Sequence, residues 1–231
     1  MPCEQEIVKI ILQSLASVVF GFVFFGLALF WPAATFQYWQ AWVFIVVFMF
    51  ATMGPSIYLA VKMPDALQRR IKAGPFAETR PLQKLIMTGT ILAVAAVLVV
   101  SAFDHRFGWS NVPTPLVVIG NVLVFLGLTI TQFVIIQNNY AGATVTVEAD
   151  QRLVSTGLYG LVRHPMYAAT LIMMFGTPLA LDSYWGLLVV APALLILAVR
   201  IQDEEKMLRE ELDGYVAYTE KVHYRLVPGV W

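Results

Sequence analysis

Long blocks of uncharged, apolar residues are the feature that most limits how this chain can fold. Four blocks approach or exceed about 20 residues, the length that an α-helix needs to cross the hydrocarbon core of a bilayer. They lie at residues 10–31, 39–61, 83–103 and 114–137. Only 13% of the residues are charged, about half of the roughly 25% that is usual in soluble domains. We therefore predict an all-α, polytopic integral membrane protein.

Two shorter apolar blocks, 165–181 and 184–199, follow and are separated only by Asp182 and Ser183. This spacing predicts a tight helical hairpin, interrupted once by Pro178. The chain then has about six transmembrane helices. The first block is longer than the apolar core of a signal peptide and lacks a basic flank, which favours a retained span.

We expect one domain over residues 1–231. Its first part, 1–137, carries four spans. Its second part, 138–231, carries a loop, the hairpin and a cytoplasmic tail helix.

The basic residues are distributed unevenly between the two sides of this topology. If the N-terminus is cytoplasmic, all but one of the 15 Lys and Arg lie inside or at a cytoplasmic helix edge, and only Arg106 lies outside. The positive-inside rule therefore favours six spans with both termini in the cytoplasm. The formal net charge of +0 excludes a globally basic nucleic-acid binder.

Cysteine and histidine residues give little support to a metal or disulfide site. Cys3 is the single cysteine, so no intrachain disulfide is available. In the six-span topology His105 lies on the opposite side from His164 and His223. We therefore expect no metal site.

The segment "LVSTGLYGLVRHPMYAATL", residues 153–171, places polar groups where the hairpin begins. Gly157 and Gly160 favour backbone turns. Pro165 suits the first turn of a helix, whose N-terminal amides favour an anionic ligand group. On these residues alone two interpretations stand equal: a ligand site, or a headgroup-facing Arg163 with tyrosines at the membrane interface.

The segment that follows the last apolar block favours the ligand site. Arg200 and Glu204 are four residues apart and share a helix face. The hairpin returns residue 200 to the side of residue 164, so His164, Tyr167, Arg200 and Glu204 can line one pocket. By the same spacing, Glu205 with Arg209 and Lys206 with Glu210 predict ordinary ion pairs on a solvated face. The basic segment 62–84, interpreted as a loop, is expected to contact anionic headgroups rather than the site.

The chemistry of this pocket matches more than one cofactor. A carboxylate accepts hydrogen bonds from hydroxyl or amino groups, a helix N-terminus receives a carboxylate, and aromatic rings face a purine or a sulfonium cation. S-adenosylmethionine carries all of these groups. A nicotinamide dinucleotide shares several of them, but the few basic residues here disfavour a pyrophosphate.

The chain resembles the isoprenylcysteine carboxyl methyltransferase family, in its broad bacterial branch, which is related to phospholipid and thiol methyltransferases. The resemblance rests on residues 151–167, the short hairpin, "RIQDEE" at 200–205 and "GYVAYTEKVHYRLVP" at 214–228. It implies an S-adenosyl-L-methionine site on the cytoplasmic side of a bacterial inner membrane, with Arg200 as the catalytic residue facing the methyl acceptor. The implied cofactor-binding residues are Gln151, Arg152, Leu153, Val154, Tyr159, His164, Pro165, Met166, Tyr167 and Glu204.

We therefore expect a membrane methyltransferase whose partners are a small or lipophilic acceptor (carboxylate, thiol or lipid-like) and membrane lipid. Two alternatives remain open at this point. One is an NADPH-dependent membrane reductase of the sterol-reductase type. The other is a non-enzymatic membrane protein, either a scaffold or a small transporter.

Overall fold

The computed structural model describes residues 16, 19–71, 78, 80–141, 147 and 151–231, and it is all-helical over these ranges. The start of the first expected span and Cys3 lie outside the described residues. A short apolar helix covers Val19–Ala33, including a π-helical turn at Gly26–Phe30 and α2 at Trp31–Ala33. The later helices are α3 (Trp39–Lys62), α4 (Pro64–Ile71), α5 (Pro81–Phe107), α6 (Thr114–Gln137), α7 (Pro165–Ala180), α8 (Trp185–Glu211) and α9 (Tyr215–Lys221).

The helices begin and end where their sequences favour it. Proline occupies the first turn of α5, α6 and α7, where its missing N–H costs no intrahelical hydrogen bond. Gly108 ends α5 in a left-handed conformation with φ of 61°, and its N–H donates to Asp104 O. These signals fix the ends of helices whose interiors are almost entirely apolar.

Four helices, α3, α5, α6 and α8, are long and apolar enough to cross a membrane, and Val19–Ala33 and α7 are shorter apolar helices. The predicted all-α, polytopic class is confirmed. With 16 residues, α7 is about 24 Å long, short of a hydrocarbon core of about 30 Å. With 27 residues, α8 is about 40 Å long, so it extends past the apolar block that ends at residue 199.

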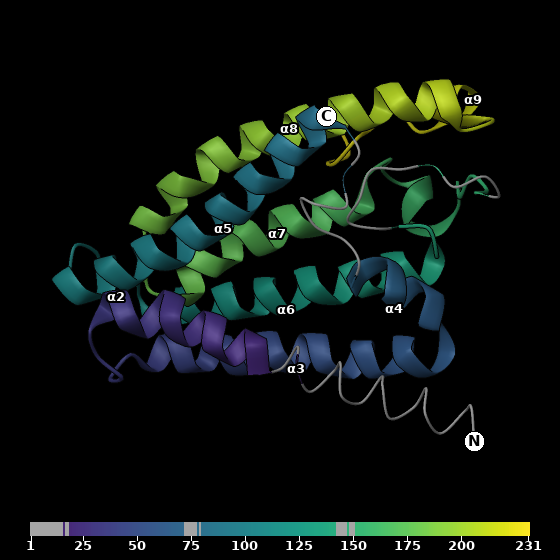
Figure 1. Ribbon diagram of the computed structural model, residues 1–231. Coiled ribbons are helices and arrows are strands. Elements are labelled where there is room, and N and C mark those ends of the chain that lie inside the picture. Colours follow the sequence, from purple (N-terminus) through teal and green to yellow (C-terminus); the bar gives the residue numbers. More distant parts are fainter. Residues whose placement is uncertain (1–15, 17–18, 72–77, 79, 142–146, 148–150) are drawn as a thin grey trace, which may run out of the picture.

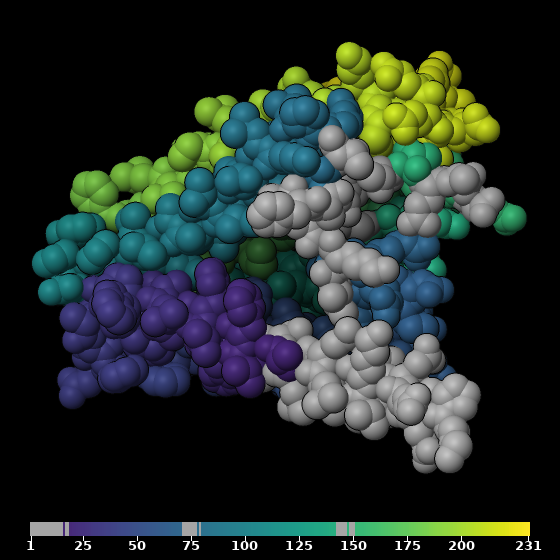
Figure 2. Space-filling view, in the orientation of Figure 1, coloured from purple at the N-terminus to yellow at the C-terminus, as the bar shows by residue number. Residues whose placement is uncertain are grey.

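The long helices run roughly alongside one another (Figure 1). The pair α6 and α7 lies between α3 on one side and α5 with α8 on the other. As a result, the ends of α3, α6 and α8 and the start of α7 gather at one end of the bundle, next to α4 and α9. Figure 2 shows the C-terminal residues and the start of α5 side by side at this end.

Small residues allow α6 and α7 to pack backbone against backbone. A Cβ placed on Gly127 would lie 2.7 Å from Ala169 O, and one on Gly176 would lie 2.8 Å from Gly120 O. Gly120 and Gly127 on α6, and Ala169 and Gly176 on α7, are each seven residues apart, so each pair shares one helix face. Close approach at small residues is a general way for helices to associate in membranes.

Two carboxylates, the buried Asp104 and the partly exposed Asp182, secure the hairpin turn at the opposite end of the bundle. Asp104 at the end of α5 accepts a hydrogen bond from Ser183 Oγ at 2.6 Å. Asp182 accepts from Gln40 Nε2 at 2.8 Å and from Val112 N at 2.6 Å. The predicted hairpin between 165–181 and 184–199 is therefore present, and its tip is tied to α3 and α5.

Candidate functional site

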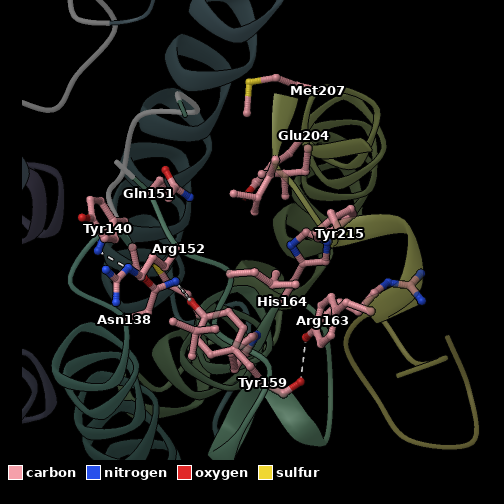
Figure 3. Close-up of a pocket in the computed structure, with 18 of the residues that line it drawn as sticks. Asn138, Tyr140, Gln151, Arg152, Tyr159, Arg163, His164, Glu204, Met207 and Tyr215 are labelled. Atoms are coloured by element: carbon pink, nitrogen blue, oxygen red, sulfur yellow. Dashed lines mark hydrogen bonds between the residues drawn. The ribbon is translucent and has the colours of Figure 1, made fainter. Parts of the chain in front are cut away.

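A pocket opens at the end of the bundle where residues 138–141 and 151–164, the start of α7, the second half of α8 and α9 meet (Figure 3). The hollow comprises about 770 Å³ of space between side chains, part of which is open to solvent. The lining residues are Asn138, Tyr140, Ala141, Gln151, Arg152, Leu153, Val154, Tyr159, Arg163, His164, Pro165, Met166, Tyr167, Glu204, Met207, Leu208, Leu212, Tyr215 and Tyr218.

All ten residues that the sequence assigns to a cofactor site line this pocket. They come from three separate segments, namely 151–159, 164–167 and Glu204 on α8. Arg200, the expected catalytic residue, is not among the lining residues and lies behind Tyr167. The structure therefore brings the ten predicted residues together around one pocket. That these residues bind a cofactor stays a prediction.

Gln137, the last residue of α6, shapes the loop before α7. Its Nε2 donates to Thr156 O at 2.7 Å, and its Oε1 accepts from Leu158 N at 3.1 Å. Gly157 has a φ of +59°, and a Cβ at this position would collide with the Gln137 amide. This position therefore requires glycine, as the sequence predicted, whereas Gly160 has only ordinary contact around it.

Hydrogen bonds on both sides fix Tyr159 at the pocket wall. Asn138 Nδ2 donates to Tyr159 Oη at 3.1 Å, and Tyr218 Oη donates to Tyr159 O at 2.6 Å. Burial raises the pKa of Tyr159 to about 12, although the Asn138 hydrogen bond opposes the shift. Burial also raises the pKa values of Tyr215 and Tyr218. These tyrosines stay neutral near pH 7 and offer hydroxyl groups and aromatic faces.

A buried ion cluster holds the loop against α8. Glu205, only 4% exposed, accepts from Arg163 Nε at 2.7 Å and pairs with Arg225 at 2.9 Å. Its Oε1 also lies 3.3 Å from His164 Nε2. The predicted solvated-face pair of Glu205 with Arg209 is therefore wrong, because the helix turns Glu205 inward toward the loop.

Arg163 is likewise a buried structural residue, not a headgroup-facing charge. Besides Glu205, its NH1 group donates to the Val222 and His223 carbonyls at 2.8 and 3.0 Å. The backbone N–H groups of Arg163 and His164 donate to Tyr224 O and Arg225 O, both at 2.9 Å. The C-terminal segment thus folds back along the loop, but residues 222–231 do not line the pocket.

Glu204, one residue earlier on α8, faces the pocket. Tyr167 Oη donates to Glu204 Oε2 at 2.6 Å and accepts from Arg200 Nε at 2.8 Å. Arg200 is 6% exposed, and its NH1 group donates to Gln83 Oε1 at 3.2 Å. Of the four residues predicted to line one pocket, His164, Tyr167 and Glu204 do so, whereas Arg200 does not and contacts Glu204 only through Tyr167.

The segment 62–84 differs from its prediction as a headgroup-binding loop. Residues 64–71 form the helix α4, and Arg69 lies 5.2 Å from the ring centre of Tyr140 at the pocket. Arg80 NH2 lies 2.5 Å from Asp203 Oδ1 on α8. Part of this segment therefore packs against the site, because α5 runs beside α8 and returns Glu78 and residues 80–83 to it.

The pocket has lining residues that the sequence analysis did not assign. Met207, Leu208 and Leu212 follow Glu204 at three, four and eight residues, which is one helix face and could have been found by extending that periodicity. Asn138 and Tyr140 approach from the end of α6. Tyr215 and Tyr218 come from α9, which lies in the segment 214–228 that carries part of the family resemblance, but the sequence analysis assigned no pocket residue there.

Over the described ranges, no three His, Cys, Asp or Glu residues are grouped so as to hold a metal ion. His105 lies at the far end of the bundle, where its ring stacks on Tyr38 at 3.9 Å between ring centres. The polar side chains that line the pocket carry carboxylate, phenol, imidazole, amide and guanidinium groups.

Comparison with known families gives one match. Residues 116–213, somewhat under half of the chain, match the family model described as phospholipid methyltransferase. This family includes the isoprenylcysteine carboxyl methyltransferases, so the resemblance inferred from the sequence is confirmed over these residues. No curated protein matches the chain. The matched segment runs from α6 through the pocket loop, α7 and α8, and supports a membrane methyltransferase.

Proposed function

We propose that this protein is a membrane-embedded, S-adenosylmethionine-dependent methyltransferase, because residues 116–213 match the phospholipid methyltransferase family model. Its acceptor is a carboxylate, a thiol or a lipid-like molecule at the cytoplasmic face. One observation carries the proposal: ten residues assigned from the sequence, in three separate segments, line a single pocket.

The groups around the pocket fit the parts of this cofactor. Glu204 offers carboxylate oxygens to hydroxyl or amino groups. Helix α7 begins at Pro165, and the first-turn amides of a helix lack intrahelical partners and attract a carboxylate. The aromatic faces of Tyr140, Tyr159 and Tyr215 suit a purine or a sulfonium cation.

When bound, S-adenosylmethionine supplies an electrophilic methyl group on sulfur. The protein's own task is then to align an acceptor in line with that bond and to exclude water. Tyr167 and Glu204, fixed to each other by hydrogen bonding, orient ligand groups on the wall shared by α7 and α8. Leu153, Leu208 and Leu212 line the pocket with apolar surface that excludes water.

Arg200 bears on the choice of acceptor. A carboxylate acceptor is already ionised near pH 7 and needs no base, whereas a thiol must lose a proton. Arg200 interacts with Tyr167, Gln83 and Glu78, so an acceptor carboxylate would compete with these partners for its guanidinium. In this proposal Arg200 supports the site from behind Tyr167.

The position of the pocket at one end of the apolar helices suits a lipophilic acceptor that arrives from the bilayer. We place this end at the cytoplasmic face of a bacterial inner membrane, because the basic residues concentrate there. The integral membrane class rests on the apolar helices and the family match.

The experiment is to incubate membranes containing the protein with methyl-labelled S-adenosylmethionine and to follow label into the protein, lipid and small-molecule fractions. The proposal expects label in one of these fractions for the wild type and a strong reduction for Glu204→Gln. Tight, selective binding of NADPH together with no transfer of label in any fraction would overturn the proposal and favour a reductase.

A further inference from the structure

The inference concerns Glu78, a buried carboxylate outside the family-matched segment and outside the pocket. Its residue is 2% exposed, and its Oε1 lies 3.4 Å from Arg200 NH2 on α8. The sequence analysis gave it no role. A carboxylate is almost never fully buried unless it is paired, and Arg200 is a partner that Glu78 contacts. The question is what this buried pair does for the nearby pocket.

A series of hydrogen bonds leads from Glu78 to the pocket, and the donor and acceptor of each bond are fixed by the chemistry of the side chains. Arg200 has only donor groups, so Tyr167 Oη must accept from Arg200 Nε at 2.8 Å. The single Tyr167 hydroxyl proton is then directed to Glu204 Oε2 at 2.6 Å. Glu78, Arg200, Tyr167 and Glu204 form a chain in which each polar group fixes the orientation of the next.

A second contact joins the same two segments and reaches Arg200 only through Gln83. Arg80 NH2 lies 2.5 Å from Asp203 Oδ1, and Gln83 Nε2 also donates to Asp203. Neither Arg80 nor Asp203 is hydrogen-bonded to Tyr167 or lines the pocket. Both contacts hold α8 against Glu78 and residues 80–83, but Glu78 pairs with Arg200 directly, whereas Arg80 is linked to Arg200 only indirectly, through Asp203 and Gln83.

We propose that Glu78 is a positioning residue for the methyl-donor site, acting through Arg200 and Tyr167 on the carboxylate of Glu204. This inference rests on the proposed function. It extends the site beyond the family-matched residues 116–213 to Glu78, which precedes α5. Because Glu78 is not among the residues that line the pocket, we expect its effect to be on the geometry of Glu204.

The test is a double-mutant cycle on the affinity of detergent-purified protein for S-adenosylhomocysteine, measured by calorimetry. Glu78→Gln removes the charge that holds Arg200, and Tyr167→Phe removes the hydroxyl that passes the effect on. Each single variant is expected to bind about tenfold more weakly, and the double variant scarcely more weakly than either, because coupled residues are not additive. Arg80→Gln is the matched control, expected to lower the thermal midpoint while leaving affinity within about twofold.

Glu78→Asp keeps the charge but withdraws it by one methylene, so it serves where Glu78→Gln does not fold. Glu78→Asp too is expected to weaken binding, because the carboxylate must lie close enough to Arg200 to orient it, and the charge alone is not sufficient. Additive effects of Glu78→Gln and Tyr167→Phe, or an equal loss of affinity in Arg80→Gln, would overturn the inference while leaving the proposed function standing. Wild-type protein that binds neither S-adenosylhomocysteine nor S-adenosylmethionine would instead overturn the proposed function, and this inference with it.

Discussion

The hydroxyl of Tyr167 donates a hydrogen bond to Glu204 Oε2 at 2.6 Å, joining the first turn of α7 to α8 at the wall of the pocket. These residues are far apart along the chain, and the helical hairpin is what brings them together. The contact explains why polar residues stand where the apolar block begins. They meet a second polar segment that the hairpin returns to the same end of the bundle.

Glu205 is predicted to stabilise the fold rather than to bind ligand. Glu205→Gln would leave Arg163, which is 7% exposed, without its buried counter-charge. Breaking a buried ion pair from one side costs about 3–5 kcal/mol, so the midpoint of thermal unfolding in detergent should fall clearly. Glu210→Gln, on the exposed face of the same helix, should leave the midpoint unchanged. Equal midpoints for the two variants would show that the cluster does not hold the loop.

Gly127 is predicted to be required for the packing of α6 against α7. A Cβ there would meet Ala169 O at 2.7 Å and Met173 Cβ at 2.9 Å, so Gly127→Ala should destabilise by about 1–3 kcal/mol through overpacking. Gly54→Ala is the control, because nothing lies within 4 Å of its added Cβ, and helix propensity favours alanine by up to about 1 kcal/mol. Thermal unfolding of both variants checks the prediction, which fails if Gly127→Ala is as stable as the wild type.

Tyr159 is predicted to ionise at a higher pH than an exposed tyrosine. Burial raises its pKa from 10.0 to about 12, because phenolate would lose water in the pocket wall. Since the folded pKa exceeds the unfolded one, the stability that this group contributes is complete below about pH 10 and is lost as the pH rises through about 12. The difference in phenolate absorbance between wild type and Tyr159→Phe should show this late titration. In denaturant the titration midpoint of Tyr159 should fall to the ordinary value near 10. A midpoint in the folded protein equal to that in denaturant would contradict the burial of Tyr159.

The two ends of the bundle are predicted to face opposite sides of the membrane. In a Cys3→Ser background, Phe36→Cys and Arg209→Cys place one exposed thiol at each end. A membrane-impermeant thiol reagent added to intact cells should label Phe36→Cys and should label Arg209→Cys only after the cells are opened. The reverse pattern would invert the proposed orientation, and labelling of both in intact cells would contradict a spanning bundle.

The sequence was sufficient for the class of fold, the hairpin and the grouping of His164, Tyr167 and Glu204. These follow from physical signals carried by the chain itself, namely block length, charge asymmetry and the return of a hairpin. The direction of Tyr167 toward both Glu204 and Arg200 is consistent with this grouping.

The sequence was not sufficient for contacts that depend on how helices rotate and pack. Glu205 satisfies the i,i+4 spacing with Arg209, yet it turns inward because Arg163 and Arg225 offer a buried partner set from distant segments. Glu78 lies in a basic segment whose composition indicates headgroup contact. Its pairing with Arg200 follows only once α5 is known to run beside α8.

The most direct test of the central claim is a cofactor titration of the detergent-purified protein with S-adenosylmethionine and with NADPH. The account predicts saturable binding of S-adenosylmethionine, weakened by about tenfold or more in Glu204→Gln, because hydrogen bonds to a charged group contribute about 1.5–3 kcal/mol. Glu211→Gln, exposed on the same helix, should bind like the wild type. Selective binding of NADPH, or S-adenosylmethionine binding that is the same in Glu204→Gln and wild type, would contradict it.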